Sequence, residues 1–183
     1  MLKVLKIILK FIGISFAIFI LIMLFIISAN DNKNKSNEVI LNSKNSESKK
    51  AIVIYQPSRT SVVKDLAYQF AKGLNDKGYE VTINYPGDFL DADLSKYSII
   101  VFGTPVYIGT PSKVLIEYIN RIKNVSDKKI ISFISGGSKE SPEIDIIKTA
   151  IGNVEQSKFV KYYTSDKNKN LTDAYNLSIS IEE

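Results

Sequence analysis

The sequence predicts an α/β fold in which a parallel sheet is covered by helices on both faces. Short apolar runs alternate with helical patterns along residues 51–183, and the runs at 51–55 and 98–102 are apolar at almost every position. Strands that alternate with helices favour parallel pairing, and a strand covered on both faces has no polar side. Residues 51–183 are therefore expected to form one domain.

Periodicity places five strands and the helices between them. Apolar residues recur at i, i+3 and i+4 in each helical segment, and the strands are short apolar or alternating runs. The predicted strands are 51–55, 79–85, 98–102, 129–135 and 158–164, and the predicted helices are 63–74, 114–122, 144–151 and a short closing helix from Leu171. The connection 86–97 has no clear helical pattern.

Residues 1–29 are predicted to anchor the chain in a membrane as a single span. Residues 11–27 carry no charge. With Lys10 snorkelling to the surface, residues 7–27 reach the roughly 20 residues that cross a bilayer core of about 30 Å. Membrane lipid is the expected partner of this segment. A cleaved signal peptide is the alternative, although residues 27–29 are a poor match to a cleavage site.

The lysines around this segment indicate its orientation. Lys3, Lys6 and Lys10 precede the apolar stretch, and a short basic tail favours a cytoplasmic N-terminus. The domain is then expected outside the cytoplasm. Lys33 and Lys35 follow the stretch, so the opposite orientation stays open.

Composition narrows the function. Residues 30–50 are rich in Asn, Ser and Lys, which indicates a flexible linker. The chain has no Cys and no His, which excludes disulfides, Ser-His or Cys-His nucleophilic catalysis and His-ligated metal sites. The net charge is +5, but the lysines form no stripe with interleaved aromatics, so no nucleic-acid partner is expected.

A possible anion site follows the first strand of the domain. The loop carries the hydroxyls of Ser58, Thr60 and Ser61, and the helix 63–74 follows it. The first N–H groups of a helix have no internal acceptor, and the macrodipole places partial positive charge there. One phosphate fits such a site. The alternative is that these hydroxyls only cap the helix.

Three segments resemble the flavodoxin family. Residues 58–63 (SRTSVV) are similar to its phosphate loop, Ser/Thr-x-Thr-Gly-x-Thr, but Ser61 replaces the glycine and Val63 the last threonine. Residues 103–109 (GTPVYIG) are similar to the loop Gly-Ser/Thr-Pro-x-Tyr-x-Gly that flanks the flavin, and Gly136-Gly137 to the small-residue loop near the flavin edge. The resemblance assigns cofactor contacts to Ser58, Arg59, Thr60, Ser61, Val62, Val63, Thr104, Pro105, Val106, Tyr107, Ile108, Gly109, Gly136 and Gly137.

This resemblance implies a doubly wound, five-stranded parallel sheet of order 2-1-3-4-5. FMN is expected outside the carboxyl ends of the first and third strands, with its phosphate at residues 58–63 and Tyr107 stacked on its ring. Neither a catalytic acid or base nor a metal site is predicted. The implied function is electron transfer at a membrane, to an unidentified redox protein or a quinone.

Two other functions remain open. One is a quinone-linked flavin oxidoreductase similar to menaquinone-dependent protoporphyrinogen dehydrogenase, a flavodoxin-like relative that typically carries extra segments. The other is a flavin-free interaction module, in which the departures at Ser61 and Val63 record lost binding.

Overall fold

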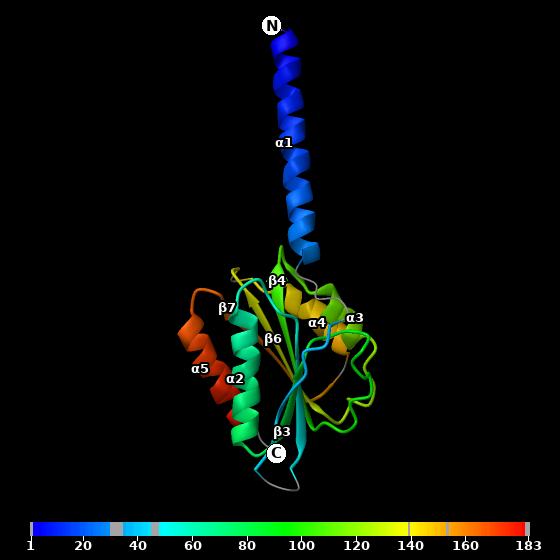
Figure 1. Cartoon of the computed structure of the whole chain (residues 1–183), viewed down its shortest axis with the longest axis vertical. Coiled ribbons are helices and arrows are strands. Elements are labelled where there is room, and N and C mark those ends of the chain that lie inside the picture. Colours follow the sequence, from blue (N-terminus) through cyan, green and yellow to red (C-terminus); the bar gives the residue numbers. More distant parts are fainter. Residues whose placement is uncertain (1, 30–34, 45–47, 139, 153, 182–183) are drawn as a thin grey trace.

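The computed structural model describes residues 2–29, 35–44, 48–138, 140–152 and 154–181. A long N-terminal helix, α1 (Leu2–Ala29), stands apart from an α/β domain (Figure 1). The strands are β1 (Val39–Leu41), β2 (Lys50–Tyr55), β3 (Glu80–Asn84), β4 (Ile99–Tyr107), β5 (Thr110–Pro111), β6 (Lys129–Gly136) and β7 (Ser157–Tyr163). The domain helices are α2 (Val62–Asp76), α3 (Lys113–Ile119), α4 (Glu143–Ile151) and α5 (Lys167–Ile179).

The strands form one mixed sheet in the order β1-β3-β2-β4-β6-β7, with β5 paired to β4. The adjacent strands β3, β2, β4, β6 and β7 pair in parallel. Strand β1 pairs antiparallel with β3, and β5 pairs antiparallel with β4. The five predicted strands therefore pair in parallel as expected, but the predicted sheet is wrong in its strand count and lacks the two antiparallel strands. The reason is that both added strands are too short to show periodicity, and each forms only because a longer strand offers it a free edge.

Strand β1 comes from the segment that the sequence analysis assigns to a flexible linker. Val39 pairs with Ile83 and Leu41 with Val81. The buried side chain of Asn84 accepts a hydrogen bond of 2.9 Å from the Asn37 N–H. The brief apolar run within a polar segment thus covers the outer edge of β3, and at least this part of residues 30–50 belongs to the sheet.

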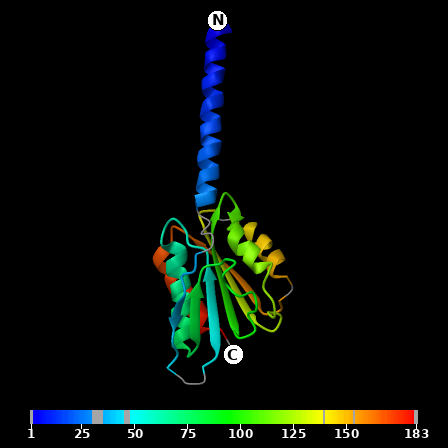
Figure 2. The same ribbon diagram turned by 45° about the vertical axis from the view of Figure 1, so that its right-hand side comes forward.

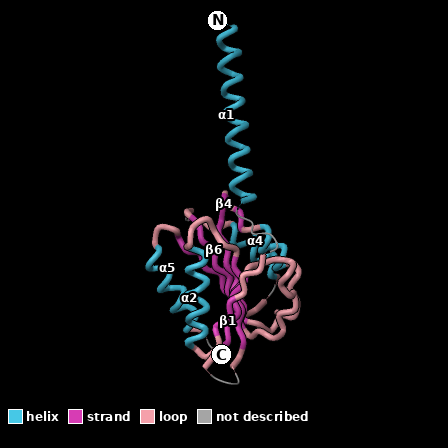
Figure 3. The backbone as a smooth tube through the Cα atoms, in the orientation of Figure 1, coloured by secondary structure: helices cyan, strands magenta, loops and turns pink. Residues whose placement is uncertain are grey.

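Helices cover both faces of the sheet (Figures 2 and 3). Helices α2 and α5 pack on one face, where the core comprises Ala51, Val53, Tyr55, Val63, Leu66, Phe70, Val81, Ile83, Val101 and Phe133 among others. Helices α3 and α4 pack on the other face, where it comprises Ile52, Ile54, Ile100, Phe102, Leu115, Ile119, Ile134 and Ile147 among others. Alternate residues of β2 and β4 enter opposite cores, as a strand buried on both faces requires.

The doubly wound arrangement brings several loops to one edge of the sheet. Because β2, β4 and β6 are parallel, their carboxyl ends lie together, and the loops that follow them face the same way. Among the described residues, this carboxyl edge carries 56–61, 108–109, 137–138 and 140–142. The connection 86–97 contains no helix, as expected, and is tied to the segment that follows α3 through the bridge between Asp93 and Lys123.

Helix α1 has the properties of a membrane span. Lys6–Phe25 is a stretch of 20 residues with a mean hydropathy of 2.8, and none of it is buried against the domain. Its length and composition suffice to cross a bilayer, and a signal sequence has the same properties.

Gly103 generates a prediction about this core. A Cβ at Gly103 lies 2.2 Å from the Phe133 ring, and that buried ring stacks on Phe70 with centroids 5.2 Å apart. The ring is fully buried and also packs against Tyr162, so Gly103→Ala is expected to lower the free energy of unfolding by about 1–3 kcal/mol. Urea denaturation of the full chain in detergent measures this.

Gly137→Ala is the matched control, because the nearest atom to its Cβ position is 4.0 Å away. It is expected to change stability little. Equal losses in both variants would show that Phe133 does not make the difference.

Candidate functional site

The loop after β2 is held by its own hydroxyls. The Ser58 hydroxyl donates to the Thr60 carbonyl at 2.6 Å. Ser61 lies at the N-cap of α2 with φ −72°, and its side chain does not cap the helix. The serine in place of the family's glycine therefore adopts an ordinary negative φ without strain. Capping does not account for the Ser61 hydroxyl.

That hydroxyl instead joins an ionic network at the start of α2. Ser61 donates to the Asp65 carboxylate at 2.7 Å, and the Lys167 ammonium of α5 lies 2.9 Å from the same oxygen. Burial acts to raise the pKa of Asp65, but the hydrogen bonds from Lys167 and Ser61 outweigh it, so the pKa lies below its usual value. The network therefore stabilises the fold above the unfolded-state pKa, and this contribution is lost as pH falls through the lowered pKa.

The sequence analysis does not identify Asp65 or Lys167. Asp65 lies in the first turn of α2, where the sequence alone indicates an interaction with the helix dipole. Its lysine partner lies 102 positions later, at the start of α5, and no local pattern connects them. The network places one negative and one positive side chain beside the predicted phosphate site.

The backbone of this helix start keeps the geometry on which the predicted anion site depends. The Asp65 N–H bonds to the Ser61 carbonyl at 2.7 Å, and by helix geometry the N–H groups before it have no acceptor within the helix. The Val63 side chain is buried in the core, so a valine stands where the family has threonine because this side chain packs inward. Val62 and Val63 can offer only N–H groups.

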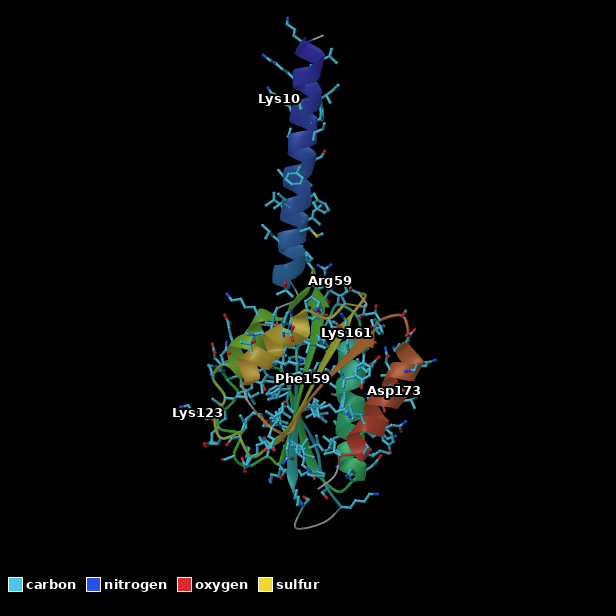
Figure 4. The ribbon with its side chains drawn as sticks, turned by 180° about the vertical axis from the view of Figure 1, so that it is seen from behind. Lys10, Arg59, Lys123, Phe159, Lys161 and Asp173 are labelled. Carbon is cyan, nitrogen blue, oxygen red and sulfur yellow. The ribbon has the colours of Figure 1, made fainter. Side chains whose placement is uncertain are left out.

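Tyr107 brings the second loop against the first. It is the last residue of β4, and its phenol oxygen accepts a hydrogen bond of 3.2 Å from the Arg59 N–H. The two loops that the sequence analysis assigns to the two ends of one ligand are thus in contact. Figure 4 shows Arg59 at the end of the domain that carries α1.

The Thr104 side chain is used within the protein. Its buried hydroxyl accepts from the Ser112 N–H at 3.0 Å and donates to the Pro105 carbonyl at 2.9 Å. Pro105 is buried and Val106 half-buried. Only the part of the predicted ring contact from Val106 to Gly109 reaches the surface, because β4 continues five residues past its predicted end before it turns.

The turn between β4 and β5 is strained. Tyr107 pairs with Thr110 across a two-residue loop, Ile108-Gly109, with φ of 53° and 71°. Positive φ at both positions is the requirement of a type I′ turn, for which Asn-Gly is preferred. An isoleucine is unfavourable there, because a β-branched side chain clashes with the backbone at positive φ. The Ile108 side chain is 63% exposed, so no packing compensates for the strain.

The third predicted loop is fixed by a buried ion pair. Gly136 ends β6, and a Cβ there would lie 3.4 Å from Val106, so this loop adjoins the hairpin. The Lys161 ammonium of β7 lies 2.5 Å from the Glu143 carboxylate, with side chains 6% and 2% exposed. Lys161 also donates to the Glu140 carbonyl. The pair attaches the loop after β6 to β7.

Other features of the domain offer less chemistry. A depression of about 480 Å³ between α3 and α4 is lined by Ile116, Asn120, Asp145, Ile146, Thr149 and Ala150. It lies on the outer surface of the helices, away from the carboxyl edge. In the described residues no three metal-ligating side chains gather. The carboxyl edge is therefore the best candidate site.

Comparison with known proteins identifies the fold. No protein-family model matches the chain, and no curated protein matches it. Among solved structures, the metal-soaked Flv1 flavodiiron core from Synechocystis sp. PCC6803 is similar with a TM-score of 0.62 and 16% identity, over 73% of this chain and 35% of that one. The chain thus spans about a third of that protein's length.

Two smaller proteins match over nearly their whole length. Oxidised flavodoxin 2 from Bacillus cereus has a TM-score of 0.52 and 16% identity, over 71% of this chain and 95% of that one. An NAD(P)H:quinone oxidoreductase from Methanothermobacter marburgensis has a TM-score of 0.51 and 13% identity, over 74% and 100%. The fold is flavodoxin-like, as the sequence resemblance predicted. The cofactor contacts of the individual residues stay predictions.

The strained turn predicts a stabilising substitution. Ile108→Asn places the residue preferred in a type I′ turn at φ 53°. Relief of backbone strain is expected to raise the free energy of unfolding by about 1 kcal/mol, measured by urea denaturation. Thr110→Asn, one strand position beyond the turn, is the control and should bring no gain. A loss of stability in Ile108→Asn would show that the turn is not strained.

Proposed function

We propose that this chain binds FMN at the carboxyl edge and transfers electrons at a membrane. The hydrogen bond from the Arg59 N–H to the Tyr107 phenol carries the proposal, because it joins a helix N-terminus and an aromatic hairpin in a flavodoxin-like fold. FMN has a phosphate for the first and a flat ring for the second. Flavodoxins and a flavodiiron core are among the similar structures.

The fit to a phosphate comes from the backbone and from cations. The N–H groups at the start of α2 that have no acceptor within the helix can donate to a phosphate. Arg59 is exposed beside them. The hydroxyls of Ser58 and Ser61 already donate within the protein, so in this arrangement they can only accept. Thr60 is exposed and can donate. The site is therefore complementary to an anion, with fewer hydroxyl donors than the family pattern has.

The fit to a flat ring comes from the hairpin. The half-buried Tyr107 ring presents an aromatic face, held by its bond to Arg59. Exposed Gly137, at the third loop, has no side chain to block the approach. Bound flavin supplies the redox chemistry, and the protein supplies orientation and access. Tyr107 and the loop after β6 limit the entry of water to the ring.

The alternatives each rest on one observation. The similarity to an NAD(P)H:quinone oxidoreductase and the apolar helix α1 favour a quinone as the electron partner. The commitment of Ser58, Ser61 and Asp65 to internal bonds favours the flavin-free interaction module. Titration with flavin separates the module from the redox functions.

FMN is expected to bind the full chain more tightly than riboflavin, because riboflavin lacks the phosphate. Asp65→Asn should tighten FMN and leave riboflavin unchanged, since it removes a carboxylate beside the phosphate. A like charge about 8 Å away at an effective dielectric constant of about 40 costs about 1 kcal/mol, which corresponds to about fivefold in affinity. Isothermal titration calorimetry in detergent measures both ligands.

Asp173→Asn is the matched control. Asp173 pairs with Lys169 at 2.7 Å on α5 and lies six residues, or about 9 Å of helix rise, beyond Lys167; Figure 4 labels it. The Asp173→Asn substitution removes the same charge as Asp65→Asn and should not change the affinity for FMN. Absence of heat with FMN at high micromolar concentration would leave the flavin-free module as the function, and equal affinity for riboflavin would refute the phosphate site.

We also propose that α1 spans the cell membrane and holds the domain outside the cytoplasm. The lysines before the apolar stretch favour this orientation. Protease added to intact protoplasts is expected to digest the domain and to spare a cytoplasmic marker. Full protection would place the domain in the cytoplasm. A released domain that has lost α1 would show that the helix is a signal sequence.

A further inference from the structure

The chain enters the domain at the carboxyl edge. Since β1 runs antiparallel to β3, its start lies beside the end of β3, with Val39 opposite Ile83. Asn84, the last residue of β3, binds the Asn37 N–H at 2.9 Å and the Ser36 hydroxyl at 3.3 Å. The segment that leads to α1 is thus attached at the edge that carries the candidate site.

The chain length limits how far this edge lies from the anchor. Seven residue steps separate Ala29, the last residue of α1, from Ser36. Whatever their path, they span at most about 25 Å. The nine residues of β4 extend about 26 Å from first to last, so the opposite edge can lie up to about that much farther from the anchor. Figures 1 and 2 show α1 at the end of the domain toward which β4 runs.

The surface of this edge combines an apolar tip with cations. Ile108 is 63% exposed at the tip of the β4–β5 hairpin and is held there at a strained φ. Arg59 is exposed in the adjoining loop, to which Tyr107 is bonded. Lys113, at the start of α3, has a side chain that is 79% exposed, and its ammonium lies 3.5 Å from the exposed Glu117 carboxylate. An apolar group flanked by cations matches the boundary between acyl chains and anionic headgroups.

We propose that the carboxyl edge docks on the lipid surface of the membrane that α1 spans. Ile108 inserts at the boundary of the acyl chains, and Arg59 and Lys113 lie against anionic headgroups. Insertion into the membrane then explains why an isoleucine occupies this strained position, where asparagine is preferred. In this position the candidate site lies closer to molecules dissolved in the bilayer than to proteins in solution. The inference rests on the proposed membrane anchor.

Single tryptophans test the docking, because the chain has none. The full chain is placed in nanodiscs that contain anionic lipids, with and without bromine on the acyl chains, and quenching of tryptophan fluorescence is measured. Ile108→Trp and Thr110→Trp probe the hairpin, and Thr110→Trp avoids the strained position. Lys96→Trp, just before β4, probes the opposite edge, and Leu21→Trp probes α1.

Quenching is expected at Leu21 and at the hairpin, and none at Lys96. Quenching at Leu21 with none at either hairpin position overturns the docking and leaves the anchor in place. No quenching at Leu21 overturns the anchor and the docking together. Equal quenching at Thr110 and Lys96 also overturns the docking, because the domain would then have no preferred face.

A second substitution separates docking from folding. Ile108→Asn, made with the Thr110→Trp probe, is expected to reduce quenching at least threefold, although it relieves strain in the turn. Ile179→Asn makes the same change at the end of α5, where the side chain is 40% exposed, and should leave quenching unchanged. Unchanged quenching in Ile108→Asn would refute the role of the hairpin tip.

Discussion

The parallel pairing of β2 with β4 is the constraint on which the candidate site depends. The register places Tyr55 opposite Gly103, and the Gln56 N–H continues the ladder to the Gly103 carbonyl at 2.8 Å. Two segments almost 50 residues apart therefore run in the same direction toward the same edge of the sheet. The contact between Arg59 and Tyr107 follows from this register. A parallel pair needs a long crossover between its strands, and the crossover supplies the helix whose N-terminus forms half of the site.

The start of α2 keeps the helix N-terminus of the predicted anion site, while its side-chain donors differ from the family pattern. In the resembling family, hydroxyls surround the phosphate. Here Ser58 and Ser61 bond internally, and Asp65 with Lys167 introduces an ion pair at the same place. The helix N-terminus still offers N–H groups, since these depend on helix geometry and not on side chains. Affinity at such a site depends on the balance between the dipole, the cations and the nearby carboxylate.

The two antiparallel additions give this sheet its individual character. The hairpin of β4 and β5 extends the third parallel strand beyond the domain and presents Ile108 to the outside. Strand β1 attaches the N-terminal segment to the outer side of β3. Each is short and each pairs with only one neighbour. Strand β1 brings the N-terminal segment to the carboxyl edge, where the hairpin also lies, so the proposed anchor is attached at the edge of the proposed site.

The sequence by itself determined the α/β class, the five parallel strands and the helices between them. Runs such as residues 51–55 and 98–102 are buried on both faces, and burial on that scale leaves a pattern in the residues themselves. It also determined the apolar character of α1, because every position from 11 to 27 is uncharged. Its three loop motifs lie at one edge of the sheet, because parallel strands bring their carboxyl ends together.

Only the tertiary structure decided what those loop residues do. Thr104 bonds to Ser112, Gly103 makes room for Phe133, and the Val63 side chain enters the core. Asp65 pairs with Lys167, which lies 102 positions later in the sequence. Strand β1 exists only because the edge of β3 is free. Each of these depends on a partner distant in sequence, and a local pattern carries no information about a contact that folding creates.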